Sequence, residues 1–150
     1  MKEDLDAKLV EKYPLIFANR HADMKITAMC WGFENGDGWY NIIDQLCACV
    51  QSHIDWRNKQ RESLLKSNPY NISIPDEVPQ VVAQQVKEKF GELRFYYIGG
   101  DDEIEGMVRM AEAMSMVTCE VCGSPGQPKS GGWIRTLCDD HEKEYQERYL

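Results

Sequence analysis

Four residues near the C-terminus have the types and the spacing of a metal site. Cys119 and Cys122 are separated by two residues, Cys138 follows after fifteen more, and His141 follows after another two. Three thiolates and one imidazole form a donor set that suits Zn²⁺, and four protein ligands leave no open position for water or substrate. The pattern therefore predicts a structural zinc ion.

The residues around these ligands predict how the site is built. Gly123 permits a tight turn after the first pair of cysteines, and residues 131–137 are typical of a glycine-led turn into a short strand. Asp139 and Asp140 then favour the first turn of a final helix, where carboxylates suit the positive end of the helix dipole. This order of knuckle, hairpin and helix predicts a module of the treble-clef type over residues 118–150.

Signatures of catalysis are otherwise missing from the sequence. There is no G-x-S-x-G, phosphate-binding P-loop, Rossmann glycine pattern or deaminase H-x-E motif. A treble-clef nuclease needs a histidine on the hairpin, and residues 123–137 contain none. The carboxylates of residues 34–38 do not have the spacing of a calcium loop. We therefore expect that the protein is not an enzyme. An enzyme that acts on a small nucleotide is kept as a third hypothesis, after the two given below.

A second group of residues, aromatic and cationic, lies next to turns and could bind a ligand. An aromatic ring contributes roughly 1–3 kcal/mol by stacking on a base, and a guanidinium can fix a phosphate. The alternative is that the aromatic residues belong to the core and the cations are solvated. The candidates are Trp39, Lys89, Arg94, Tyr96, Trp133 and Arg135.

Arg94 and Tyr96 are the strongest pair in this group. Residues 93–98 alternate as a central strand would, which places both side chains on one face. The inference requires that the face with Leu93 is the buried one.

Length, composition and charge limit the possible classes of function. The chain has 150 residues, 43% hydrophobic and 28% charged, which is typical of a folded globular protein. Its net charge of −8 opposes binding to duplex nucleic acid. No apolar run approaches the roughly 18 residues of a membrane span, and no signal segment opens the chain. We expect no membrane partner and a cytoplasmic location, with Cys30, Cys47 and Cys49 as reduced, buried thiols.

Hydrophobic periodicity predicts an α+β body, residues 1–117, on which the zinc module docks because almost no linker precedes Cys119. The body is expected to contain a small sheet covered by helices, with a long polar surface connection at 58–79. The strands are predicted at 26–33 and 92–98, and the helices near 3–13, 40–57, 80–90 and 103–116.

Three finer features follow from the same pattern. His53 lies beside the apolar stripe of its helix and is interpreted as structural. An aspartate of Asp101-Asp102 is expected to cap the helix that follows Gly99-Gly100. The methionines at 107, 110, 114 and 116 are expected to be core filler rather than a binding stripe.

Several segments resemble small proteins encoded by bacteriophages and prophages. The likeness covers about residues 30–141, and its zinc half is the most specific part. It implies an accessory protein that works in the cytoplasm of a bacterial host, and it implies no catalytic residue. The similar segments are 32–40, 87–97, 106–115 and 119–141.

Two hypotheses of function follow from this resemblance and from the residues. The first is a non-enzymatic protein that sequesters a small nucleotide-type signal of a bacterial defence system. The second is an inhibitor or adaptor that binds a host protein through its acidic surface. A homo-oligomer is compatible with both.

Overall fold

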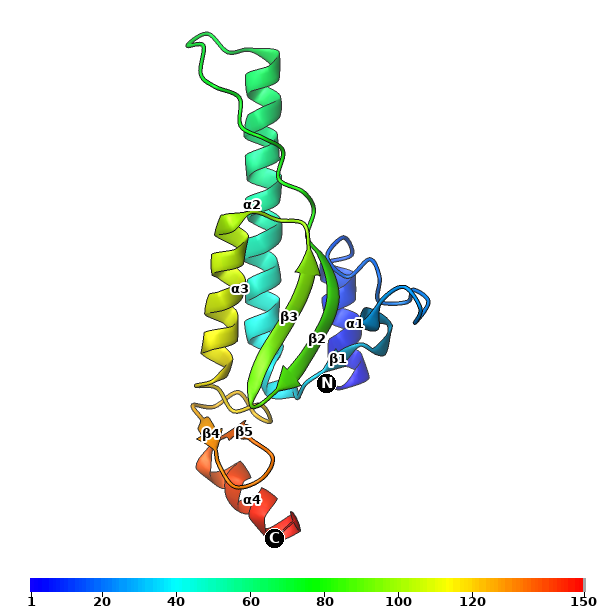
Figure 1. The fold of residues 1–150 in the computed structure, drawn as a ribbon, viewed down its shortest axis with the longest axis vertical. Helices are drawn as coiled ribbons and strands as arrows, with labels where there is room; N and C mark the ends of the chain where they lie inside the picture. The colour runs from blue at the N-terminus through cyan, green and yellow to red at the C-terminus, as the bar shows by residue number, and fades with distance from the viewer. Residues whose placement is uncertain (150) are drawn as a thin grey trace.

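The computed structural model describes residues 1–149, and within them it has an α+β architecture with four α-helices and a small mixed sheet (Figure 1). The helices are α1 (Glu3–Lys12), α2 (Tyr40–Lys66), α3 (Asp102–Ser115) and α4 (Asp139–Tyr149). The strands are β1 (Phe33–Glu34), β2 (Val82–Lys89), β3 (Glu92–Ile98), β4 (Gln127–Lys129) and β5 (Arg135–Leu137), with short 3₁₀ helices η1 (Ala28–Trp31) and η2 (Asp37–Trp39).

The main sheet has the order β1-β2-β3, with β1 parallel and β3 antiparallel to β2. Helices α2 and α3 lie side by side along it, and α1 lies near β1 (Figure 1). Leu93 and Phe95 of β3 are buried together with Val86 of β2, in one core that includes the apolar stripe of α2. The face with Leu93 is therefore the buried one, as the alternation of β3 required.

The predicted strand 92–98 and the predicted helix near 103–116 are confirmed by β3 and α3. Asp101 caps α3 as expected, since its Oδ1 accepts a hydrogen bond from Ile104 N at 3.0 Å. His53 is structural, with Nε2 2.7 Å from Asp101 Oδ2. The helix predicted near 40–57 is longer than expected, because α2 continues to Lys66.

The prediction of a helix near 80–90 is wrong, because these residues form β2. A register irregularity between Ala83 and Gln85 adds one residue to the strand. The buried residues Val81, Ala83 and Val86 are therefore spaced by two and then by three, which imitates helical spacing. Phe90 and Gly91, with φ of 54° and 79°, then form the two-residue turn to β3.

The prediction of a strand at 26–33 is also wrong apart from its last residue. Residues 28–31 form η1, which begins where Thr27 Oγ1 accepts a hydrogen bond from Met29 N at 3.1 Å. The same hydroxyl donates to Gln84 O at 3.1 Å, so Thr27 ties this turn to β2. Phe33 alone of the predicted strand enters the sheet, paired with Val86.

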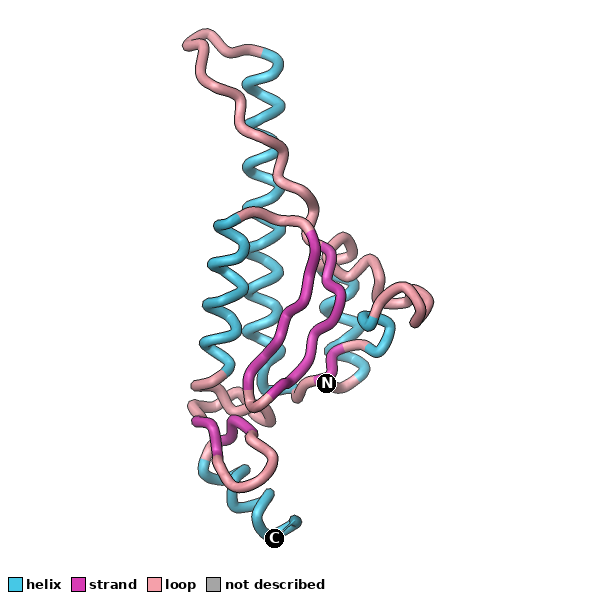
Figure 2. The backbone as a smooth tube through the Cα atoms, in the orientation of Figure 1, coloured by secondary structure: helices cyan, strands magenta, loops and turns pink. Residues whose placement is uncertain are grey.

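The predicted connection at 58–79 begins as helix and returns as an extended segment. The end of α2 projects beyond α3, and the returning chain runs back beside it (Figure 2). Asn58 holds the return through two hydrogen bonds, to Val78 O at 3.0 Å and from Val78 N at 2.8 Å. We refer to residues 56–75 as the arm. Among residues 1–149, no helix is both long and apolar enough to span a lipid bilayer.

The outer edge of β3 is closed by side chains of α3. Leu93 N donates to Ser115 Oγ at 2.8 Å, and Phe95 N donates to Glu112 Oε2 at 3.3 Å. An unpaired strand edge is a site of aggregation, and these two acceptors satisfy it inside the molecule. Burial raises the pKa of the Glu112 carboxyl, against the opposing effect of the bond from Phe95 N.

Replacing Glu112 by glutamine is expected to flatten the dependence of stability on pH. A carboxyl whose pKa is raised by folding favours the folded state when protonated, and that contribution is lost as pH rises from 4.5 through the folded-state value. The wild-type free energy of unfolding should therefore fall, relative to Glu112→Gln, between pH 4.5 and 7. Urea unfolding across this range measures it, with the exposed Glu105→Gln as control. Identical pH profiles for wild type and Glu112→Gln would contradict it.

Candidate functional site

The four predicted metal ligands lie together, and they could hold a metal ion. One potential ligand atom from each residue lies within 4.8 Å of the others. His141 Nδ1 is 3.2 Å from Cys138 Sγ and 3.6 Å from Cys119 Sγ, and Cys122 Sγ is 3.9 Å from Cys138 Sγ. Cys138 directly precedes α4, and His141 lies in the first turn of that helix.

The turn that carries the first two cysteines favours a thiolate. Gly123 N donates to Cys119 O at 2.9 Å, and Gly123 has a φ of 79° that glycine adopts without strain. Hydrogen bonds involving the side chain and backbone of Ser124 lower the pKa of the Cys122 thiol to about 6. The thiolate is the form that binds metals, and a lowered pKa favours the thiolate of Cys122 at neutral pH.

The cluster is docked on the body through the loop that precedes α2. Trp39 Nε1 donates to Thr118 O at 2.9 Å, and Gly38 N donates to Glu120 O at 2.8 Å. Gly36 N donates to Glu120 Oε1 at 3.0 Å. The predicted contact between body and metal module is therefore made of backbone and buried side-chain hydrogen bonds.

Glu120 is a buried acid at the centre of this contact. Burial raises the pKa of its carboxyl, while Arg135 and Gly36 N act in the opposite direction. Arg135 NH2 lies 3.6 Å from Glu120 Oε2, so the guanidinium offsets the buried charge. Glu120 thus connects three segments: the cysteine turn, β5 and the loop before α2.

The hairpin of the metal module makes a second contact, with the turn between β2 and β3. Thr136 Oγ1 donates to Gly91 O at 2.5 Å. A Cβ atom at Gly91 would come within 3.2 Å of Ile134 Cγ2, so the two turns are closely packed. These contacts fix the position of β5 against the turn at the end of the main sheet.

Large apolar side chains are exposed where these two turns meet. Phe90 is 67% exposed, Trp133 69% and Ile134 38%. We refer to these three residues as the junction patch. Gly91, next to Phe90, packs against Ile134, next to Trp133, so the three exposed residues belong to two turns that are in contact. Exposed large apolar residues grouped in this way mark a contact site for another molecule more often than an isolated exposed residue does.

Phe90 carries a further sign of function, because its backbone conformation is unfavourable for its residue type. Its φ of 54° is in the left-handed region, which glycine, asparagine and aspartate occupy at lower cost than a phenylalanine. Because its ring is exposed, burial in the core does not offset the cost of this backbone conformation. Backbone strain without a packing reason is typical of residues kept for contact with a ligand or partner.

The structure does not bring the six predicted ligand-binding residues into one site. Trp39 is fully buried and donates to Thr118 O, so no ligand can stack on it; its role is structural. Arg94 and Tyr96 share the outer face of β3, and Arg94 NH2 pairs with Glu92 Oε2 at 3.1 Å.

The other three predicted residues lie at the junction. Lys89 directly precedes Phe90, with Nζ 5.8 Å from the centre of that ring. Trp133 belongs to the junction patch, and Arg135 follows it in β5 with its guanidinium over the ring of Tyr145 at 5.5 Å. Arg135 also lines a small cleft of about 130 Å³ beside α4.

Comparison with known proteins adds no relative. No protein-family model, curated protein or solved structure matches the chain.

Two residues of the site, Phe90 and Glu120, were missed by the sequence analysis. Phe90 was assigned to the apolar face of a helix that does not exist. Gly91, just before the alternating residues 93–98, was the signal for a turn at this point of the chain. Glu120 lies between two ligands and had no sequence signal for burial.

Proposed function

We propose that the Cys₃His cluster holds a structural zinc ion in a module of the treble-clef type. Bonds of about 2.3 Å from zinc to sulfur and about 2.0 Å to nitrogen require roughly 3.8 Å between sulfurs and 3.5 Å between sulfur and nitrogen in a tetrahedron. The distances of 3.9, 3.6 and 3.2 Å between the ligand atoms support such a site. The order of cysteine turn, β4–β5 hairpin and α4 supports the module type.

The function that this geometry supports best is a non-enzymatic adaptor or inhibitor that binds a partner protein through the junction patch. The observation that carries this proposal is Phe90, an exposed aromatic residue at positive φ, in a turn that packs against the hairpin with the exposed Trp133. Zinc stabilises the hairpin that presents Trp133 and Ile134. Aromatic residues at the centre of a rigid patch are typical of protein interfaces.

The shape of the patch favours a protein partner over a small nucleotide. Small ligands bind in concave sites of roughly 300–1,000 Å³ that bury most of their surface. The cleft beside Arg135 has only about 130 Å³, and the rings of Phe90 and Trp133 are mostly exposed. The phage resemblance suggests a host protein as the partner, and the net charge of −8 favours a basic one.

Site-specific photo-crosslinking tests this proposal. A photoreactive phenylalanine analogue is placed at Phe90 or Trp133 and, as a control, at the exposed Met24 of the opposite part of the chain. In bacterial cells, one discrete adduct is expected from both junction positions and none from the control. Adducts that form equally from all three positions, or from the control alone, would contradict it.

Replacing Phe90 by asparagine is expected to separate stability from binding. Asparagine tolerates positive φ, so the variant should be about as stable as wild type or more stable by up to roughly 1 kcal/mol. It removes an exposed ring that the proposed interface needs, so the crosslink from Trp133 should weaken at least tenfold, as for a typical hot spot. Thermal unfolding and the crosslink yield measure the two effects. A large loss of stability would show that Phe90 is structural.

Sequestration of a nucleotide-type signal is the second candidate, and the open face of β3 favours it. Arg94 and Tyr96 lie there together, on the same hairpin as Lys89. Native mass spectrometry of protein from bacteria with an active signalling defence tests it, with Arg94→Glu and Arg135→Glu as variants. Retained mass of a few hundred daltons, lost in both variants, would support it. Retention unchanged in both variants would contradict the site.

A further inference from the structure

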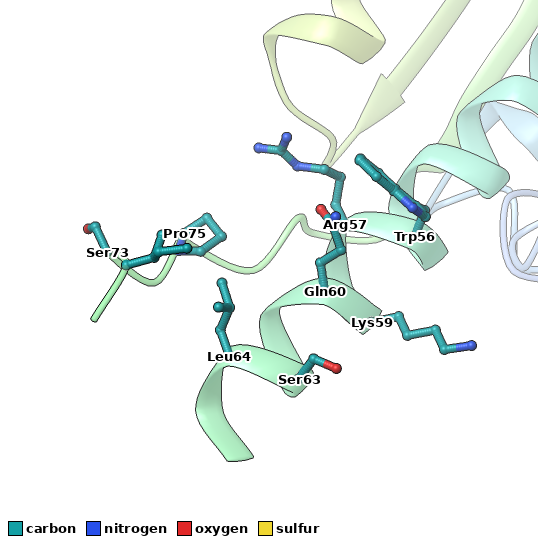
Figure 3. Close-up of a pocket in the computed structure, with 9 residues that line it drawn as sticks. Trp56, Arg57, Lys59, Gln60, Ser63, Leu64, Ser73 and Pro75 are labelled. Carbon is teal, nitrogen blue, oxygen red and sulfur yellow. The ribbon is translucent and has the colours of Figure 1, made fainter. Parts of the chain in front are cut away.

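One face of α2 carries two hollows along its length. The first, about 590 Å³, lies between α2 and α3 and is almost entirely apolar; Leu46 and Cys49 line it opposite Met107, Met110 and Met114. The second, about 750 Å³, lies on the arm and is lined by Trp56, Gln60 and Leu64, of which Leu64 points toward Pro75 of the returning chain (Figure 3).

The two hollows belong to the same side of the helix. Residues seven apart are almost two full turns apart in an α-helix and therefore share a face. Ile42 and Cys49 line the first hollow, and Trp56 and Ser63 line the second at the same interval. The two hollows therefore lie on one face of α2, and they are separated where His53 of α2 contacts Asp101 at the start of α3.

Met110 and Met114 of α3 are exposed, which corrects their assignment as core filler, whereas Met107 is partly buried and packs against the core as expected. Met110 is 65% exposed and Met114 47%, whereas the buried face of α3 consists of other residues. Trp56 on the arm is 57% exposed. Cys49, expected to be a buried thiol, is exposed in the first hollow, while Cys47 is buried. A tryptophan and flexible methionines in open hollows favour packing against a partner.

The two regions beside the hollows, the arm and α3, have opposite net charge. The arm carries four cations and one carboxylate, a net charge of +3: Arg57, Lys59, Arg61, Lys66 and Glu62. The segment of α3 with its cap carries five carboxylates and one cation, a net charge of −4: Asp101, Asp102, Glu103, Glu105, Glu112 and Arg109. Glu112 is turned toward β3 and Asp101 toward His53, whereas Asp102 and Glu103 are exposed at the start of α3. The arm that carries the second hollow is thus basic, and the α3 segment beside the apolar groove has a net negative charge.

We infer that a second copy of this chain occupies the groove, with its arm lying between α2 and α3 of the first copy. The two α2 helices run antiparallel about a two-fold axis near residues 52–53. Each arm then meets the partner's groove, and the basic arm faces the acidic α3. The groove residues 42–49 and the arm residues 56–63 are stretches of equal length. The two-fold rotation that places one arm in the partner's groove therefore also places the partner's arm in the first groove. Such an interface is closed, and it produces a dimer rather than a filament. This inference does not depend on the proposed function.

Light scattering and sedimentation measure the mass, which should be twice 17.3 kDa for the full chain at sufficient concentration. Trp56→Ala should weaken dimerisation roughly thirtyfold, since tryptophan is a typical hot spot. Arg57→Glu/Lys59→Glu should weaken it roughly tenfold or more, and added salt should weaken the wild-type dimer. The matched control is Lys8→Glu/Lys25→Glu, the same charge change at two exposed lysines outside the arm, which should leave the dimer intact.

A disulfide crosslink tests the arrangement itself. In a Cys49→Ser background, two single variants are made at exposed positions, Gln45→Cys and Gln60→Cys. An antiparallel pair about residues 52–53 places position 45 of one copy opposite position 60 of the other. Mixing the two variants should give a crosslinked dimer under mild oxidation, and neither variant alone should do so.

Three outcomes would overturn the inference. The first is a monomer at every concentration at which the protein is soluble. The second is a dimer that crosslinks within each single variant and not in the mixture. The third is a dimer that Trp56→Ala and the arm charge reversal leave unchanged, because it would use another surface. A protein that stays monomeric and binds an amphipathic helical peptide in the groove would count as the first outcome.

Discussion

Cys138→Ser is expected to release the bound metal ion and to unfold residues 118–149. Structural zinc contributes roughly 10–16 kcal/mol of apparent binding free energy to small modules, as much as the whole stability of a typical domain. β4 and β5 have three residues each and α4 has no buried residue, so little else holds this segment. Metal analysis and amide hydrogen exchange measure the effect.

The matched control is Cys49→Ser, which changes an exposed cysteine outside the cluster and should retain one metal ion per chain. In Cys138→Ser, amides of 118–149 should lose protection while those of β3 keep part of theirs. A metal-free Cys138→Ser protein with full protection in α4 would show that the module folds without metal. In that case the zinc proposal would fail, while the packing described for β3 would stand.

Gly38→Ala is expected to destabilise the protein by about 3 kcal/mol, at the upper end of typical overpacking costs. A Cβ atom at Gly38 would lie 2.1 Å from Cys119 O and 2.6 Å from Gly123 N. Both are backbone atoms of the metal turn, so they cannot rotate away as a side chain would. Relief of the clash requires the loop to separate from the module, which also breaks the bond from Gly38 N to Glu120 O. The midpoint of urea unfolding measures the loss.

Gly106→Ala is the matched control and should have the opposite sign. Gly106 lies within α3, and a Cβ atom there would meet nothing within 4 Å. Because glycine costs roughly 0.5–1 kcal/mol relative to alanine inside a helix, this variant should gain about that much. Both variants are compared at one protein concentration. Equal stability of Gly38→Ala and wild type would mean that the loop and the module are not in contact in solution.

Local patterns of the sequence predicted those features that depend on neighbouring residues. The ligand set of Cys119, Cys122, Cys138 and His141 could be identified because metal ligation restricts residue type and spacing together. β3 could be predicted because strict alternation over 93–98 has only one buried face. An aspartate of the pair Asp101-Asp102 could be predicted as a cap because a capping acceptor binds a backbone group three residues away, and the structure selects Asp101.

The prediction failed for β2 because its pattern was altered by a tertiary feature. The irregularity at Ala83 and Gln85 exists only because β2 pairs with β3, and it changes the interval between buried residues. Phe90 then completed a false helical stripe. A sequence pattern cannot distinguish a bulged strand from a helix when one extra residue shifts the period.

The sequence by itself determined the candidate metal ligands, the donor chemistry they offer and the two faces of β3, because each of these depends on residue types and spacing along the chain. Only the tertiary structure decided that Trp39 is buried and that the turn of Phe90 and Gly91 packs against the hairpin that carries Trp133. It also decided that Met110 faces solvent. Burial depends on which distant segments pack together, and periodicity along one element does not contain that information.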